Sequence, residues 1–193
     1  MKQVARLFIA VCALSVFSCG KDPQLNVDCT NGSANFPCFA VGHEMHYAIT
    51  SLTDDDSMVI RIADRPDSGT FKSQVTFWPS GLVNNLYYHT CGKDLYTSTA
   101  GDFLEYSHWW LSLDADPGAV WTRSTQGNLY TYRLYSKTAT VTTTLGQTYT
   151  NCYKFTYHTS TNFLTDTIYF KPDKGIVFYT GPELTYELVY ENF

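Results

Sequence analysis

The feature that most constrains this chain is an alternation of apolar and polar residues with a period of two. Between residues 148 and 158, one side of an extended chain would carry Tyr149, Tyr153, Phe155 and Tyr157. The other side would carry Thr148, Thr150, Cys152, Lys154, Thr156 and His158. Successive side chains of a β-strand point to opposite faces, so this pattern predicts a strand with one face in the core and one in water.

Turn-forming residues separate several such runs. The clearest case is residues 168–179, where two apolar runs flank Pro172 and Gly175. Proline presets φ for the second position of a turn, and glycine adopts the left-handed conformation that reverses the chain, so this segment predicts a hairpin. Only residues 102–113 could be helical, and even there the pair Trp109 and Trp110 favours a strand. The sequence therefore predicts an all-β fold. We expect an antiparallel, strongly curved sheet (half-barrel, barrel or sandwich) with about ten strands and little helix.

The first residues of the chain predict export. Residues 1–6 carry positive charge, and residues 7–17 form an uncharged apolar run about half the length of a membrane-spanning helix. The next residues, Val16-Phe17-Ser18-Cys19, resemble a lipobox, where a lipoprotein signal peptidase cuts before a cysteine that carries acyl chains. Cleavage at the same bond without a lipid is the alternative. We expect a signal peptide over 1–18, a lipidated tether over 19–28 and a single β domain over 29–193.

Charge indicates how the protein would meet a membrane. The formal net charge is −5, which argues against a nucleic-acid partner. An acidic body is not attracted to anionic lipid, so the acyl chains on Cys19 would have to provide the anchor. We predict a bacterial outer membrane lipoprotein, on the periplasmic face or at the cell surface.

Two further passages resemble a known group of proteins. Residues 35–47 read Asn-Phe-Pro-Cys-Phe-Ala-Val-Gly-His-Glu-Met-His-Tyr, and residues 141–154 are followed by the hairpin around Pro172. Together they are similar to the opening and closing strands of small bacterial cell-envelope lipoproteins of unassigned function. The resemblance implies a curved antiparallel sheet in an open or incomplete barrel, and it implies no catalytic residues.

The cysteines suggest disulfides. If Cys19 is acylated, Cys29, Cys38, Cys91 and Cys152 remain as thiols in an oxidising compartment, and three pairings are possible. Cys29 and Cys38 flank a turn-rich segment, so a local bridge between them is the simplest pairing and leaves Cys91 with Cys152. The alternative is that Cys91 and Cys152 are buried free thiols. No close Cys-x-x-Cys pair is present, so we expect no zinc site.

Two polar clusters could suggest metal binding. His43 and His46 are three residues apart, whereas the helical zinc motif needs histidines four apart, so a strand with polar residues is favoured. The aspartates at 54–56, and Asp114 with Asp116, lack the spaced oxygen ligands of a calcium loop. We interpret these aspartates as solvated turns and expect no metal and no cofactor.

A third cluster could suggest hydrolysis. Asp102 and Glu105 could serve as a glycosidase acid and nucleophile near Trp109 and Trp110, and His108 is close in sequence. That chemistry requires two carboxyl groups at a fixed separation across a sugar, which spacing in sequence does not establish. We therefore expect a protein that is not an enzyme, and a hydrolase is the weakest alternative.

The aromatic residues carry most of the functional information. The chain has four Trp, 15 Tyr and 12 Phe, more than a core of this size requires. Our candidate ligand-binding residues are Tyr88, Trp109, Trp110, Tyr130 and Tyr132. The simpler interpretation is that they form cross-strand pairs that stiffen the sheet. We predict a non-catalytic module that binds an apolar ligand or an envelope protein, and a surface glycan-binding lipoprotein with aromatic stacking residues is the alternative.

Overall fold

A computed structural model describes residues 32–51, 56–66, 69–98, 108–125, 128–160, 165–182 and 184–192. Two short 3-10 helices, η1 (Gly32–Asn35) and η2 (Pro37–Phe39), precede the strands. The first six strands are β1 (Glu44–Ser51), β2 (Ser57–Asp64), β3 (Thr70–Trp78), β4 (Val83–Cys91), β5 (Asp94–Ser98) and β6 (His108–Ser112). The other six are β7 (Val120–Thr125), β8 (Asn128–Thr142), β9 (Thr148–Thr159), β10 (Asp166–Lys171), β11 (Gly175–Thr180) and β12 (Leu184–Asn192).

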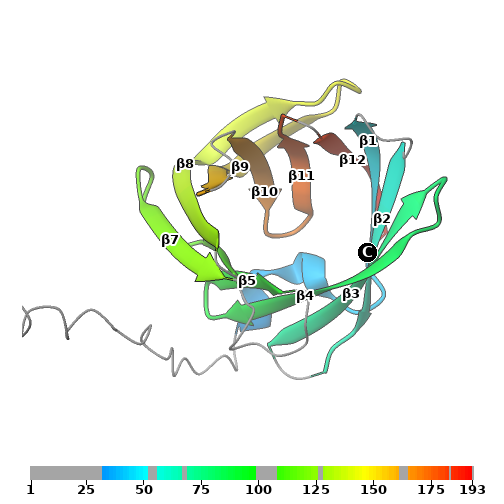
Figure 1. Ribbon diagram of the computed structural model, residues 1–193, viewed down its shortest axis with the longest axis horizontal. Coiled ribbons are helices and arrows are strands. Elements are labelled where there is room, and N and C mark those ends of the chain that lie inside the picture. The colour runs from blue at the N-terminus through cyan, green and yellow to red at the C-terminus, as the bar shows by residue number, and fades with distance from the viewer. Residues whose placement is uncertain are drawn as a thin grey trace, which may run out of the picture.

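All twelve strands form one antiparallel sheet in the order β6-β5-β4-β3-β2-β1-β12-β11-β10-β9-β8-β7. We call β1–β6 the first wing and β7–β12 the second wing. The wings join where β1 pairs with β12, and the sheet curls around an interior without closing, so that β6 and β7 are its edges (Figure 1). This confirms the predicted all-β, antiparallel, strongly curved fold with little helix. The structure has twelve strands where about ten were predicted.

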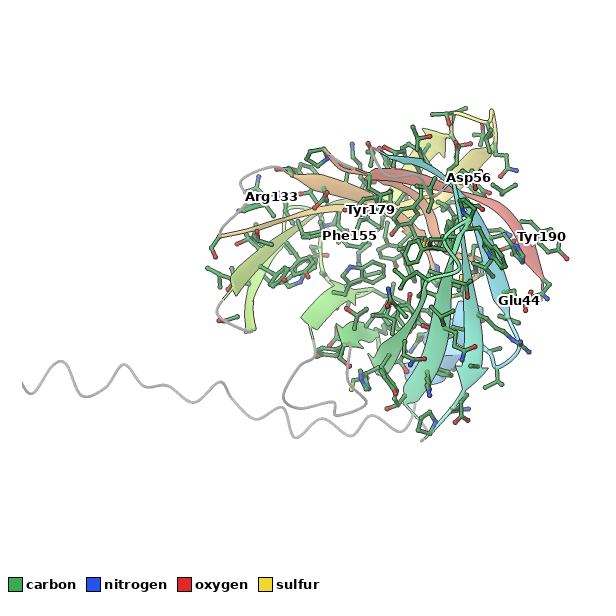
Figure 2. All side chains as sticks on the ribbon, turned by 45° about the vertical axis from the view of Figure 1, so that its right-hand side comes forward. Glu44, Asp56, Arg133, Phe155, Tyr179 and Tyr190 are labelled. Atoms are coloured by element: carbon green, nitrogen blue, oxygen red, sulfur yellow. The ribbon has the colours of Figure 1, made fainter. Side chains whose placement is uncertain are left out.

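The period-two pattern determines which residues face the interior. Phe155 in β9 pairs with Ile168 in β10 and with Leu134 in β8, and all three side chains are almost completely buried. Figure 2 shows Phe155 and Tyr179 inside the curve of the sheet, whereas Glu44 and Tyr190 lie on its outer face. The predicted hairpin over residues 168–179 is confirmed by the pairing of β10 with β11.

One residue of the predicted strand departs from its expected face. Cys152 was expected on the exposed side of β9, but it is completely buried. The register between β8 and β9 shifts between Ala139 and Val141, and Asn151 has a positive φ of 56°. Each irregularity changes which face the following side chain occupies, so strict alternation fails at this point.

One end of the interior is filled by the segment that precedes β1. We call residues 36–39 the plug; in Figure 1 the blue 3-10 helices lie within the curve of the sheet. Phe39 stacks on Tyr88 with ring centroids 4.3 Å apart, and Phe36 lies 6.2 Å from the ring of Phe170. The backbone N–H of Cys38 donates to the carbonyl oxygen of Pro172, in the β10–β11 turn, at 3.2 Å. The plug therefore connects both wings at this end.

The long β8–β9 hairpin reaches β12. In its turn, the Thr144 hydroxyl donates to the carboxylate of Glu187 in β12, and the Leu145 N–H donates to the same carboxylate at 3.2 Å. The Tyr149 hydroxyl also donates to the Leu188 carbonyl oxygen at 3.2 Å. Burial disfavours the charged form of Glu187, but the hydrogen bonds from Thr144, Thr143 and the Leu145 N–H outweigh this effect and lower its pKa.

The cysteines differ from the predicted pairings. Cys38 and Cys152 are buried free thiols, so the structure contains neither a Cys29–Cys38 bridge nor a Cys91–Cys152 bridge. Cys38 lies in the plug, and its side chain is completely buried in the core. Burial raises the pKa of Cys38, and it raises the pKa of Cys152 to about 11. Cys91 is disulfide-bonded, and its partner lies outside the described residues, as do Cys19 and Cys29.

Within the part of the chain that the structure describes, no helix has the length and apolar character needed to cross a membrane.

Candidate ligand-binding cavity

The interior beyond the plug contains a cavity of about 280 Å³. Its wall comes from both wings and is mainly apolar. The lining residues are Met58, Ile60, Val75, Phe77, Leu86, Tyr88, Thr97 and Trp110 from the first wing, and Ile176, Leu184 and Tyr186 from the second. The volume is just below the range of about 300–1,000 Å³ that is usual for ligand pockets, so a small molecule would fit.

The position of the cavity follows from strand direction. Phe71, at the start of β3, contacts the plug through Phe39, with ring centroids 5.9 Å apart. Phe77, six residues later on the same face of β3, lines the cavity. Met58 pairs with Phe77 at the start of β2. One inward-facing row of β3 therefore begins against the plug and ends at the cavity.

Trp110 connects the first wing to the second. It comes from the edge strand β6, and its ring makes edge-on contacts with Phe155 at 5.4 Å and with Phe170 at 5.8 Å. These contacts connect the edge strand of the first wing with β9 and β10 across the interior. The indole thereby forms one side of the cavity.

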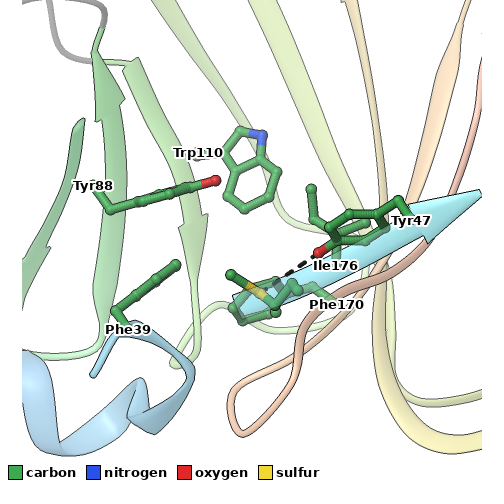
Figure 3. Close-up of a pocket in the computed structure, with 8 residues that line it drawn as sticks. Phe39, Tyr47, Tyr88, Trp110, Phe170 and Ile176 are labelled. Atoms are coloured by element: carbon green, nitrogen blue, oxygen red, sulfur yellow. Dashed lines mark hydrogen bonds between the residues drawn. The ribbon is translucent and has the colours of Figure 1, made fainter. Parts of the chain in front are cut away.

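A second, much smaller space of about 10 Å³ lies between the plug and the main cavity. Figure 3 shows it between Phe39, Tyr47, Phe170 and Ile176, with the Tyr88 hydroxyl pointing toward the ring of Trp110. This volume is about that of one water molecule. The plug is therefore closely packed on this side, although a partly open pocket of about 210 Å³ lies beside Phe36, Phe39 and Phe71.

The second wing contributes a group of stacked tyrosines. Tyr186 lies parallel to Tyr179, with ring centroids 4.6 Å apart, and meets the edge of Tyr47 at 5.3 Å. The hydroxyls of Tyr157 and Tyr179 are 3.4 Å apart. Burial raises the pKa of Tyr88, Tyr186 and Tyr179 well above the ordinary value of 10.0, so these hydroxyls remain neutral at physiological pH.

The candidate aromatic residues do not all reach the cavity. Tyr88 and Trp110 line it, but Tyr132 is buried between Trp121, with ring centroids 5.7 Å apart, and Tyr157 at 5.5 Å. Tyr130 is partly buried beside the core. The side chain of Trp109 is outside the described part of the chain.

These positions bear on the prediction of a glycan platform. The exposed aromatic side chains of the described residues are Trp78, Tyr135 and Tyr190. They come from β3, β8 and β12, no two of which are neighbours in the sheet. A sugar-stacking surface needs aromatic faces side by side, so no observation favours this alternative.

Sequence reasoning missed most of the cavity wall. Met58 and Ile60 alternate with Val59 and Arg61 in the sequence, and this pattern could have drawn attention to them and to Phe77 opposite. Leu184 and Tyr186 follow the same alternation in β12. Local patterns identify inward-facing residues, but they do not distinguish those that fill the core from those that line a hollow.

The polar clusters examined for chemistry have ordinary partners where they are described. The Glu44 carboxylate lies 3.5 Å from both His46 and Arg61 on the outer face, and Asp114 pairs with Lys93 at 2.7 Å. Across the described residues, no group of three His, Cys, Asp or Glu side chains could hold a metal ion. Asp54, Asp55, Asp102, Glu105 and the side chain of His108 lie outside the described residues.

Fold and site together define a class: an antiparallel β-protein whose single open sheet encloses an apolar cavity, sealed at one end by its own N-terminal segment. No protein family model matches the chain, and no curated protein sequence resembles it significantly.

Proposed function

We propose that this protein is a non-catalytic, envelope-anchored lipoprotein that binds a small, mainly apolar molecule in the cavity of its curved sheet. The observation that carries the proposal is the 280 Å³ hollow with an apolar wall built from both wings. This hollow is partly open to the surface, so a molecule from solution could enter it, and its apolar wall would bury the apolar part of that molecule.

The wall has the properties of a preformed site. Its residues come from hydrogen-bonded strands, and Trp110 is held by Phe155 and Phe170. A ligand would therefore find its surroundings already ordered, which reduces the entropy cost of binding. Apolar ligand surface buried there would contribute about 25 cal/mol per Å².

A fluorescence experiment tests this proposal. We would titrate the full chain carrying Cys19→Ala, so that no acyl chain can enter the cavity, with the neutral apolar probe N-phenyl-1-naphthylamine. The double variant Leu86→Trp and Leu184→Trp places two larger side chains in the cavity wall and should weaken probe binding at least tenfold. The matched control is Leu82→Trp with Leu129→Trp, since both leucines are exposed on the surface.

The control variant should bind the probe as the parent does. Equal affinity of the two double variants, or no probe binding by the parent, would refute a ligand-binding cavity. Circular dichroism must show that both variants keep the β-sheet spectrum. Mass spectrometry of the purified protein would then identify any molecule that accompanies it.

The anchor is a separate part of the proposal. It is supported by the lipobox-like Val16-Phe17-Ser18-Cys19 and by the apolar run before it. Acyl chains on Cys19 would hold the domain at the outer membrane, on its periplasmic face or at the cell surface. Labelling cells with palmitate should mark the wild-type protein and not Cys19→Ala, and equal labelling of the two would rule the anchor out.

A further inference from the structure

The polar atoms in the cavity wall indicate what kind of molecule would fit. No lining residue is charged, and the polar side chains are those of Tyr88, Thr97, Trp110 and Tyr186. A buried ion without a counter-charge is strongly unfavourable, so this wall does not suit a charged ligand. Polar groups of a neutral molecule, in contrast, would find hydrogen-bond partners there.

Three of these groups have no hydrogen-bond partner among the described residues: the hydroxyls of Tyr88 and Tyr186 and the indole N–H of Trp110. Neighbouring tyrosines do have partners: the Tyr47 hydroxyl donates to the sulfur of Met45 at 3.6 Å, and the Tyr153 hydroxyl donates to the Leu113 carbonyl oxygen at 3.4 Å. The three groups are therefore free to donate a hydrogen bond to water or to a ligand in the cavity.

The unpaired groups are accessible from the cavity. Within the described residues, Glu191 Oε2 is the one side-chain oxygen or nitrogen that is fully buried and lacks a partner. The hydroxyls of Tyr88 and Tyr186 and the indole nitrogen of Trp110 therefore keep some accessible surface, although Tyr88 as a whole is only 4% exposed. Since these residues line the cavity, a ligand there could reach the three groups.

All three groups can donate a hydrogen bond. The indole N–H can only donate, and both tyrosines stay protonated because burial raises their pKa. Hydrogen-bond donors favour a ligand that carries an acceptor.

We infer that the cavity selects a neutral, mainly apolar molecule that carries a hydrogen-bond acceptor, such as an ester or ketone oxygen. The hydroxyls of Tyr88 and Tyr186 and the N–H of Trp110 are the donors available to that acceptor, and the apolar wall holds the remainder of the molecule. This inference rests on the proposed function. It adds the chemical class of the ligand, and it excludes a fatty-acid anion, whose carboxylate would find no counter-charge in this wall.

A competition experiment tests the inference on the full chain carrying Cys19→Ala. Methyl decanoate and decanoate have the same chain, but only decanoate is charged at pH 8. Each would be titrated against bound N-phenyl-1-naphthylamine. We expect methyl decanoate to bind at least tenfold more tightly than decanoate at pH 8, and the difference to shrink near pH 4, where the acid becomes neutral.

Tyrosine-to-phenylalanine variants then test the donors. Tyr88→Phe and Tyr186→Phe remove one hydroxyl each and should weaken methyl decanoate about two- to tenfold, as expected for a lost neutral hydrogen bond. Tyr190→Phe is the matched control, since this tyrosine is 57% exposed on the outer face, and it should have no effect.

The possible failures are distinguishable. If the parent does not bind the probe, the proposed function fails and the inference fails with it. If the probe binds but decanoate competes as well as its methyl ester, or if both cavity variants bind the ester as the parent does, the cavity remains a binding site and the inferred ligand class is wrong.

Discussion

The two ends of the interior are built from the same strands, yet only one of them is filled. At the closed end, the plug residues Phe36 and Phe39 are 1% and 2% exposed, and the space between the plug and the core is about 10 Å³, although a partly open pocket of about 210 Å³ also lies beside Phe36, Phe39 and Phe71. Toward the other end, equivalent inward-facing positions enclose about 280 Å³. The difference arises from a segment outside the sheet, because the plug occupies one end only.

This comparison shows how an open sheet can combine stability with a hollow. The closed end concentrates aromatic contacts between the plug and both wings, so it can supply much of the packing energy. The other end is then free to leave polar groups unpaired and space unfilled. The predictions below test whether stability and the cavity are separated in this way.

The largest expected effect on stability comes from replacing one phenylalanine at each end of the interior by alanine. Phe39→Ala should lower the free energy of unfolding by about 3–5 kcal/mol, because it removes a fully buried ring from the plug. Phe77→Ala should cost only about 1–2 kcal/mol, because that ring is partly buried and already faces a hollow. Urea unfolding followed by circular dichroism measures both values. If both variants lost the same free energy of unfolding, the expected difference in packing between the two ends would be contradicted.

A smaller effect is expected from two glycines with positive φ. Gly175 has φ +83° at the closed end, and a Cβ built there would lie 2.8 Å from the sulfur of Met45; Gly81 has φ +71°, and nothing lies within 4 Å of its Cβ. Both changes to alanine incur the left-handed penalty of about 1–2 kcal/mol. Gly175→Ala should cost a further 1–3 kcal/mol, roughly, for displacing Met45.

Thermal or urea unfolding of the two glycine variants gives the comparison directly. A cost for Gly81→Ala that equals or exceeds that of Gly175→Ala would show that the closed end is less tightly packed than the structure indicates.

The smallest expected effect lies outside the interior, at the turn of the β8–β9 hairpin, where Thr144 and Leu145 donate hydrogen bonds to Glu187. The pKa of Glu187 is lowered in the folded protein from its ordinary value of 4.5, so its stabilisation is complete above that value and is lost as the pH falls through the folded pKa. Glu187→Gln should therefore lower stability by about 1 kcal/mol at pH 7 and have little effect at pH 3. Urea unfolding at both pH values measures this change.

Thr144→Val supplies a second variant for the same contact, since it removes the hydroxyl that donates to Glu187. The loss of stability caused by this substitution should also decrease at low pH. A cost that is independent of pH for both variants would mean that the charge of Glu187 does not stabilise the hairpin.

Much of the fold was predictable because its causes are local. Alternation in β9 placed Phe155 on the core face of a strand, and the turn residues Pro172 and Gly175 identified the β10–β11 hairpin. Prediction failed where contacts with residues far away in the sequence determine the position of a side chain. Cys152 is buried through a register shift against β8, and Cys38 is buried in the core as part of the plug.

The site was harder to predict than the fold. Tyr88 and Trp110 were among the candidate residues, but they were chosen for their aromatic character and not for their position. Phe77, Leu86 and Tyr186 were missed, because the wall joins seven strands drawn from both wings. Adjacency of that kind depends on strand order, which alternation within single strands does not reveal.

The amino-acid sequence by itself determined the secondary structure of this protein: alternating side chains and turn residues act over a few positions, so they specify strands and hairpins directly. Tertiary structure alone decided that the sheet stays open, that residues 36–39 fill one end, and that the other end encloses a cavity. These outcomes depend on contacts between residues far apart in the chain, such as Trp110 with Phe155 and Cys38 with Pro172, whose partners no local pattern identifies.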